Sequence, residues 1–342
     1  MSTLPRTALA LLLAGVLAPA YAAGTAPAKP LHVVDRLALG GPGGWDYLAV
    51  DAPRHHLFVS RGDRVMVVDL ATRKLVGTIT GTDGVHGIAF DPARKEGFTS
   101  DGHAASVTVF DLDTLKVLAT IRGTGENPDA IAFDPASGRV FTLNGRGHSA
   151  SVIDPAKRAV VATIALPGKP EFAVADGNGR LYVNIEDKSE LAEIDTGSDK
   201  LLRTWSLAPC ESPSGLAFDA AHRRAFSVCD NRVMAVSDVD HGRVVTTVPI
   251  GEGPDAAVFD PSTHTVYSSN GQSGTLTVVH QVDADHYTVA ATVPTQKSAR
   301  TMALDPTTQR LYLSAATLGS KRNARGWSIA EPGSFVVLEV AH

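Results

Sequence analysis

Polar side chains recur at one position of a repeated phrase, and six of the seven can carry charge. Each lies five residues before an aspartate that closes the phrase; they are Asp46, His86, Asp129, Glu171, Ser214, Asp255 and Arg300. Carboxylates and imidazoles bind divalent cations or transfer protons, and a guanidinium holds an anionic group. If the repeats arrange these residues around one opening, they form a candidate binding or catalytic site.

Three of these residues, Asp46, His86 and Asp129, belong to consecutive repeats and form a candidate metal site. One ion needs its ligands at ~2.0–2.6 Å, which neighbouring repeats can offer and opposite repeats cannot. Carboxylates suit calcium, magnesium or manganese, and His86 shifts the preference toward a transition metal. Hydrated carboxylates without an ion are the alternative, so a divalent metal is a candidate cofactor of open identity.

The same residues offer acid–base chemistry. Two carboxylates held close together raise the pKa of one of them, and a histidine titrates near neutrality, so either could act as a general base. In an enzyme the catalytic residues would be His86, Asp129, Glu171 and Arg300, with Arg300 holding an anionic group or a developing oxyanion. The sequence contains no serine–histidine–aspartate order, phosphate loop or HExxH pattern. It therefore leaves open whether the protein is an enzyme.

The phrase that carries these residues recurs about every 43 residues. Clear copies are GIAFDP at 87–92, AIAFDP at 130–135 and AAVFDP at 256–261, and the closing aspartates are Asp51, Asp91, Asp134, Asp176, Asp219, Asp260 and Asp305. Such spacing indicates one supersecondary unit copied seven times. Asp followed by Pro suits the first two positions of a type I turn, so we interpret the aspartates as structural.

Each unit has the pattern of four short strands separated by turns. In the second unit these are residues 88–90, 98–100, 106–110 and 117–121, and almost no helical periodicity competes with them. Four antiparallel strands in each of seven units predict an all-β fold, a seven-bladed β-propeller. The last unit lacks its outer strand. Residues 32–41 resemble the outer strands of other units, and pairing them with 335–340 would close the ring.

This architecture predicts where the polar residues lie. The inner strands of a propeller begin at one mouth of the central channel, and the loops after the second strands open on the same face. We therefore predict a small-ligand site at this mouth. Its residues are Asp46, Arg61, His86, Asp129, Asn144, Arg146, Glu171, Asn184, Glu186, Asp255, Asn270 and Arg300. A hydrated polar mouth without a ligand is the alternative.

The N-terminal residues have the pattern of an export signal. Arg6 supplies a positive charge, residues 8–18 are apolar or small, and Ala20-Tyr21-Ala22 fits a signal-peptidase site. We predict a signal peptide over 1–22, a flexible leader over 23–30 and a single propeller over 31–342, exported to a bacterial periplasm. The apolar run is too short for a stable membrane-spanning helix, so we predict no membrane insertion, with an uncleaved anchor as the alternative.

The charge balance bears on the partner. The chain has 31 Lys and Arg against 36 Asp and Glu, a net charge of −5 at pH 7. Proteins that bind nucleic acid usually carry a basic face, and the composition shows no basic excess. Nucleic acid is thus a disfavoured partner. We expect a small molecule as the partner of a monomer, and a protein partner is the alternative.

Two further features stand outside the repeat. Cys210 and Cys229 flank two antiparallel neighbouring strands of the fifth unit, so in an oxidising compartment we predict a disulfide; free thiols with a redox or copper role are the alternative. Residues 315–334 form the one long insertion of the array, with Lys321, Arg322, Arg325 and Trp327. Long loops often act as lids. A solvated excursion explains the insertion equally well, so its role stays open.

An aromatic residue follows each closing aspartate by six or seven positions: Phe58, Phe98, Phe141, Tyr182, Phe226, Tyr267 and Tyr312. The segments that they open, FVSR, FTSD, FTLN, YVNI, FSVC, YSSN and YLSA, are degenerate copies of Tyr-Val-Thr-Asn. On these segments the chain resembles the YncE-like, YVTN-repeat propeller proteins of bacterial periplasms, across residues 31–342. The resemblance implies a propeller in the periplasm. It implies no single activity, because this broad group and the lactonase-like propellers beside it include binders, proposed nucleic-acid binders and enzymes.

From these observations we expect a periplasmic propeller that binds a small ligand at the mouth of its channel, with a divalent metal as a candidate cofactor. A lactonase-like hydrolase or lyase that uses the same carboxylates and histidine is one alternative. A protein-interaction scaffold is the other.

Overall fold

The computed structural model describes residues 1–2, 30–322, 326 and 328–342. The predicted signal peptide and leader lie almost wholly outside these residues, as do Arg325 and Trp327. By its internal contacts the chain divides into a compact unit, Leu31–Ala341, and a unit of chain ends. Only the compact unit is described below. Among the described residues, no helix is both long and apolar enough to cross a membrane.

The compact unit consists almost entirely of antiparallel strands. Six blades are each formed by four strands consecutive in the chain, and these strands are β2 (Leu48–Asp51), β3 (His56–Arg61), β4 (Arg64–Asp69) and β5 (Lys74–Thr80); β6 (Val85–Asp91), β7 (Glu96–Asp101), β8 (Ser106–Asp111) and β9 (Val117–Arg122); β10 (Pro128–Asp134), β11 (Arg139–Asn144), β12 (Ser149–Asp154) and β13 (Ala159–Ala165); β14 (Pro170–Ala175), β15 (Arg180–Ile185), β16 (Glu190–Asp195) and β17 (Lys200–Ser206); β18 (Pro213–Asp219), β19 (Arg224–Cys229), β20 (Val233–Asp238) and β21 (Arg243–Pro249); and β22 (Pro254–Asp260), β23 (Thr265–Asn270), β24 (Thr275–Gln281) and β25 (Tyr287–Pro294). Two short 3-10 helices are η1 (Ala52–Arg54) and η2 (Glu186–Lys188).

A further four-stranded sheet combines the two ends of the unit, so the described residues hold seven four-stranded sheets in all. Its strands are β26 (Thr301–Asp305), β27 (Arg310–Ala315), β30 (Val336–Ala341) and, on the outside, β1 (His32–Ala38). β1 pairs antiparallel with β30 from His32 opposite Ala341 to Ala38 opposite Val336. This is the closure predicted for residues 32–41, and it covers the edge that β30 would otherwise expose.

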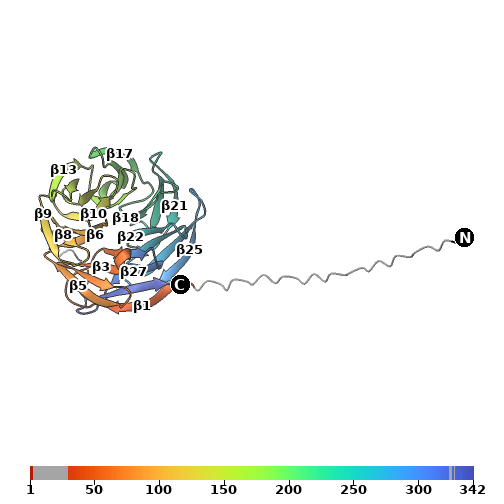
Figure 1. Ribbon diagram of the computed structural model, residues 1–342, viewed down its shortest axis with the longest axis horizontal. Coiled ribbons are helices and arrows are strands. Elements are labelled where there is room, and N and C mark those ends of the chain that lie inside the picture. The colour runs from red at the N-terminus through yellow and green to blue at the C-terminus, as the bar shows by residue number, and fades with distance from the viewer. Residues whose placement is uncertain (3–29, 323–325, 327) are drawn as a thin grey trace. The chain divides into compact units, whose positions relative to one another are not determined.

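The blades surround a central channel. Figure 1 shows β6, β10, β18 and β22 near the centre, and β1, β5, β9, β13, β17, β21 and β25 at the periphery. Inner strands of neighbouring blades contact each other, as β18 and β22 do. The aromatic residues that open the YVTN-like segments lie between blades: Phe58, for example, is fully buried against Phe90, with ring centroids 5.0 Å apart. They belong to the hydrophobic core.

Six of the seven closing aspartates are structural, as predicted, and the seventh, Asp51, pairs with Arg54. Asp91 Oδ1 accepts hydrogen bonds from the backbone N–H groups of Ala93, at 3.0 Å, and Arg94, at 3.2 Å. Five further aspartates, at positions 134, 176, 219, 260 and 305, likewise accept a hydrogen bond from the backbone N–H of the residue two positions later. Each carboxylate thus stabilises the turn after an inner strand.

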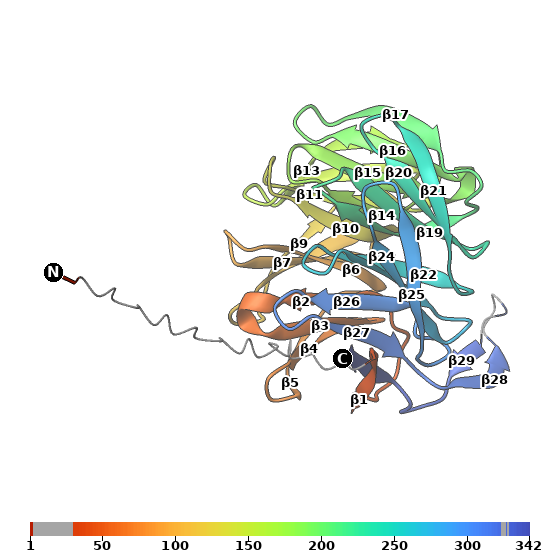
Figure 2. The ribbon, with the colours of Figure 1, turned by 90° about the vertical axis from the view of Figure 1, so that its right-hand side faces the viewer.

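The disulfide between Cys210 and Cys229 is also as predicted, with the two Cα atoms 5.6 Å apart. It ties the segment before β18 to the end of β19. The insertion forms a hairpin of its own, β28 (Leu318–Arg322) with β29 (Ser328–Ala330). Figure 2 shows this hairpin standing apart from the four-stranded sheets. Most of the described residues of β28 are exposed, so this hairpin is solvated.

Candidate functional site

The beginnings of the inner strands bring six ionisable side chains to one mouth of the channel. They are Asp46, His86, Asp129, Glu171, Asp255 and Arg300, all partly buried. Each comes from a different blade, and the register of the repeat places them at one level. The seventh position differs, because Ser214 is buried and donates its hydroxyl to the Pro254 carbonyl at 3.0 Å.

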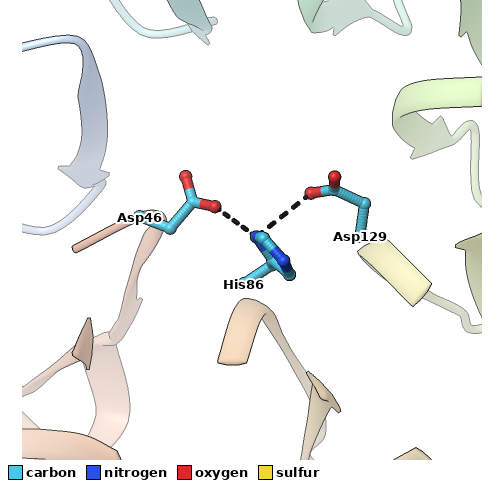
Figure 3. Close-up of side chains that lie close together, drawn as sticks. All are labelled: Asp46, His86 and Asp129. Atoms are coloured by element: carbon cyan, nitrogen blue, oxygen red, sulfur yellow. Dashed lines mark hydrogen bonds and ion pairs between the residues drawn. The ribbon is translucent and has the colours of Figure 1, made fainter. Parts of the chain in front are cut away.

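His86 lies between two aspartates from the neighbouring blades (Figure 3). Its Nδ1 is 2.6 Å from Asp46 Oδ2 and 3.5 Å from Asp129 Oδ1. Burial by itself would lower the pKa of His86, but the hydrogen bond to Asp46 and the negative charges of Asp129 and Asp46 raise this pKa to about 9. The imidazole is therefore an imidazolium near neutrality, and it acts as a donor rather than as a general base.

Arg300 lies near the other carboxylate oxygen of Asp46, the one that does not contact His86. Its Nη2 lies 3.4 Å from Asp46 Oδ1 and donates to the Trp45 carbonyl at 3.2 Å, while its Nη1 pairs with Asp255. Burial tends to raise the pKa of Asp46, but the charge of Arg300 and the hydrogen bond from His86 lower it overall. Asp46 is thus a carboxylate flanked by two cations.

The other three acids of the mouth are crowded. Burial is the largest cause that raises the pKa of Glu171, to about 8, and the charge of Asp129 adds to it. Burial likewise raises the pKa of Asp255 to about 6 against the pull of Arg300, and it raises the pKa of Asp129. Burial is thus the main cause of the raised pKa values, and the charges of the other acids of the mouth add to it.

Tyr47 lies beneath the ring of charges. It is 7% exposed, and its ring centroid is 5.1 Å from that of Phe172 on β14. Burial raises the pKa of the phenol well above its usual value, and the charges of Asp255, Asp46, Glu171 and Asp129 add to the shift. All four carboxylates therefore act electrostatically on this hydroxyl. Below this aromatic pair the channel holds a cavity of about 580 Å³, which Tyr47 and Phe172 line together with mostly apolar inner-strand residues.

Two residues of the mouth escaped the sequence prediction. Lys169 lies 3.2 Å from Glu171 Oε2 and also pairs with Glu186. The Nδ2 of Asn127 lies 3.5 Å from Asp129 Oδ2. Both residues occupy the same place in the repeat, two residues before the ring position. A search for polar residues two positions before each ring residue would therefore have identified both of them.

Several predicted ligand-binding residues are instead enclosed within or between blades. Arg61 is fully buried; its Nη2 donates to the carbonyls of Gly41 and Pro42 at 3.1 and 3.0 Å, and its guanidinium lies 3.7 Å above the ring of Phe335. A ligand at the mouth could reach this side chain only if the segment around Gly41 moved.

The predicted asparagines are also buried. Asn144 donates to Ser149 and Ser151 at 3.0 and 2.9 Å. Asn270 makes the same pattern with Thr275 and Thr277, and Asn184 donates to the carbonyls of Ser214 and Gly215. The side-chain amides of these asparagines are therefore used in hydrogen bonds within and between the blades. Of the remaining predicted residues, Glu186 joins the mouth through Lys169, and Arg146 is exposed, 3.9 Å from Glu126.

No family model matches the sequence, and no curated protein matches it either. Solved structures do match. The chain is similar to "Structure of U3-55K" with a TM-score of 0.77 and 12% identity, covering 92% of this chain and 99% of that one. It is similar to "Crystal structure of RRP9 WD40 repeats" with a TM-score of 0.76 and 12% identity, covering 91% and 97%. At this identity the likeness shows the fold alone, a β-propeller like those of WD40 repeats. The YVTN-repeat resemblance stays a prediction.

Proposed function

We propose that this protein binds a small, positively charged ligand at the mouth of its central channel. The observation that carries the proposal is the convergence of four carboxylates, Asp46, Asp129, Glu171 and Asp255, from four blades onto one opening. His86 lies 2.6 Å from Asp46 and 3.5 Å from Asp129, and Arg300 pairs with both Asp46 and Asp255. The charges of all four acids also act on the hydroxyl of Tyr47.

The balance of charge at the mouth favours a cation. Among the described residues, the acids of the ring and Glu186 face three basic side chains: His86, Arg300 and Lys169. Arg300 is shared between Asp46 and Asp255, and Lys169 between Glu171 and Glu186. Because burial and the charge of Asp129 raise the pKa of Glu171 to about 8, this acid keeps its proton near neutrality. A cation that enters the mouth lowers this pKa and thereby gains a further carboxylate partner.

The floor of the mouth adds apolar contact. The rings of Tyr47 and Phe172 pack against each other and line the cavity of the channel, and aromatic faces attract organic cations. The pattern of residues 1–22 supports export. The proposed ligand is therefore one available in the periplasm.

The test is a thermal-shift panel on the chain from Pro30 onward. Inorganic divalent cations, a primary amine and a quaternary ammonium ion are compared with anions of matched size. We expect cations to raise Tm and anions to leave it unchanged. In the double variant Glu171→Gln/Asp255→Asn the rise should shrink, whereas Glu126→Gln, which removes an exposed charge outside the ring, should keep it. No rise with any cation would contradict the proposal.

A protein-interaction scaffold is the second candidate, and the likeness to WD40-repeat structures favours it. Exposed apolar side chains lie on the outer strands of separate blades: Leu75 on β5, Leu118 on β9 and Leu202 on β17 are 48%, 49% and 49% exposed. If these blade rims bind a protein, Leu118→Ser/Leu202→Ser should weaken that binding and leave the cation response intact. The mouth variants should do the reverse.

A further inference from the structure

We propose that Asp46, His86 and Asp129 bind a divalent transition-metal ion, of the class of Zn²⁺ or Mn²⁺, at one side of the mouth. This inference rests on the proposed cation-binding function and deepens it, because it assigns the cation and its ligands. The proposal rests on one observation. Three consecutive blades each contribute one possible ligand atom, and all three atoms lie within 4.8 Å of one another.

The two distances from His86 fit one ion after a small adjustment, and the two aspartate oxygens lie within 4.8 Å of each other. His86 Nδ1 lies 2.6 Å from Asp46 Oδ2 and 3.5 Å from Asp129 Oδ1 (Figure 3). Ligands ~2.1 Å from a tetrahedral or octahedral ion lie roughly 3.0–3.4 Å apart. The first separation must lengthen and the second shorten slightly, both by less than an ångström. The proton on Nδ1 leaves to solvent when the metal binds, because a metal-bound imidazole is neutral.

The parts of these residues that face away from the ion have their own partners. Asp46 Oδ1 is 3.4 Å from Arg300, and Asp129 Oδ2 is 3.5 Å from Asn127. The backbone carbonyl of His86 accepts a hydrogen bond from Ser60 Oγ at 2.6 Å. Such outer contacts orient the ligands of metal sites and are part of their design.

Gly102 packs against the Cδ2 and Nε2 side of the His86 imidazole. A Cβ at this position would lie 2.8 Å from both Cδ2 and Nε2 of His86. Only a glycine lets the ring stand where its Nδ1 faces the two aspartates. Gly102 is thus a positioning residue that never touches the ion.

Tyr47 lies next to this cluster on the channel side. It is 7% exposed, and the charges of Asp46 and Asp129 act on its hydroxyl. Three protein ligands leave coordination positions open on a metal ion, and a water or a ligand oxygen can fill them.

The ligand set predicts the class of metal. Two carboxylate oxygens alone would suit Ca²⁺ or Mg²⁺, which prefer oxygen ligands throughout. An imidazole nitrogen in the set shifts the preference toward first-row transition metals. Zn²⁺ and Mn²⁺ should therefore bind more tightly than Ca²⁺ or Mg²⁺.

The experiment is equilibrium dialysis of the tag-free chain from Pro30 onward, stripped with a chelator, against each of these four ions. We expect one Zn²⁺ or Mn²⁺ per chain, and affinity weaker by about 100-fold or more in Asp46→Asn, His86→Gln and Asp129→Asn. The matched control is His103→Gln. His103 is an exposed histidine 3.4 Å from Asp83, and its loss should leave the affinity unchanged.

Gly102→Ala provides a variant in which every ligand is retained. We expect about 10-fold weaker binding of the metal, and a lower Tm in the stripped protein because the displaced ring loses part of its contact with Asp46. The absence of stoichiometric binding, or binding that survives His86→Gln, would overturn the metal site. If no metal binds but amines still raise Tm through Glu171 and Asp255, this inference alone fails. If no cation of either kind has an effect, the proposed function fails with it.

Discussion

The Nδ1 atom of His86 lies 2.6 Å from Oδ2 of Asp46, although the two residues belong to different blades. This contact joins the inner strands of neighbouring blades at the channel mouth. Burial alone would lower the pKa of His86, but the hydrogen bond to Asp46 and the charges of Asp129 and Asp46 raise it from 6.5 to about 9.

The stability of the metal-free protein should therefore depend on pH through His86. A raised histidine pKa contributes stability that is fully present below pH 6.5 and is lost as the pH rises through about 9. We expect the free energy of unfolding to fall by up to about 3 kcal/mol over this range. Urea unfolding at a series of pH values measures it. His86→Gln should remove this part of the slope, and an unchanged slope in that variant would contradict the assignment.

Asp101 makes the stability of the protein depend on pH in a second way. The cause here is burial of the acid rather than pairing with a charged partner. It is fully buried, and Thr99 and Thr108 donate to its two oxygens at 2.7 Å each. Burial raises its pKa from 3.8 to about 7, although these hydroxyl hydrogen bonds oppose the shift. The folded state thus holds a proton that the unfolded state has lost. Stability from this group declines as the pH rises from about 4 to about 7, and it stays low above that range.

Asp101→Asn should consequently stabilise the protein at pH 8 by about 2–4 kcal/mol. The amide reproduces the arrangement of Asn144, which donates to hydroxyls five and seven residues later. Ser106 and Thr108 occupy those places after Asp101. Chemical denaturation at pH 5 and pH 8 measures the effect. Equal stability of the variant and wild type at pH 8 would show that Asp101 is not a buried acid of this kind.

Removal of β1 should destabilise the whole unit. A chain that begins at Gly40 lacks the partner of β30 and the contacts of Val33 and Leu37 with the adjoining core. We expect a loss of roughly 3 kcal/mol or more and a tendency to aggregate through the exposed edge. Thermal unfolding compared with a chain that begins at Pro30 measures the loss. Equal melting of the two chains would disprove the closure.

Gly215 tests how closely the inner strands pack. A Cβ at this position would lie 2.6 Å from the Cα of Ala256 on the next blade, and backbone cannot move aside as a side chain can. Gly215→Ala should cost about 1–3 kcal/mol through overpacking. Gly44→Ala, where a Cβ meets nothing within 4 Å, is the control. Its denaturation curve should match that of wild type, and a Gly215→Ala curve that also matched would refute the close approach.

The repeat made much of the fold predictable, because periodicity constrains whole units rather than single residues. The turn aspartates, the closing strand and the Cys210–Cys229 bond all follow from the position of each segment within its unit. The ring from Asp46 to Arg300 was predictable for the same reason. The hairpin β28–β29 was not, since it lies in the one segment that has no counterpart in the other repeats.

Side-chain direction limited the prediction of the site. Asn144 and Asn270 end second strands near the mouth, yet they turn into their own sheets because serine or threonine hydroxyls on the next strand bind them. The hydroxyl residues five and seven positions later were a visible signal of this. Arg61 has no such signal: its partners are the carbonyls of Gly41 and Pro42, which only the folded chain brings near.

The most direct test of cation binding at the mouth is anomalous scattering from crystals of the chain from Pro30 onward grown with Mn²⁺. The account predicts an anomalous peak bounded by Asp46 Oδ2, His86 Nδ1 and Asp129 Oδ1, and its loss in crystals of His86→Gln. Well-ordered crystals in which Mn²⁺ saturates other sites and leaves no peak within the ring would contradict it.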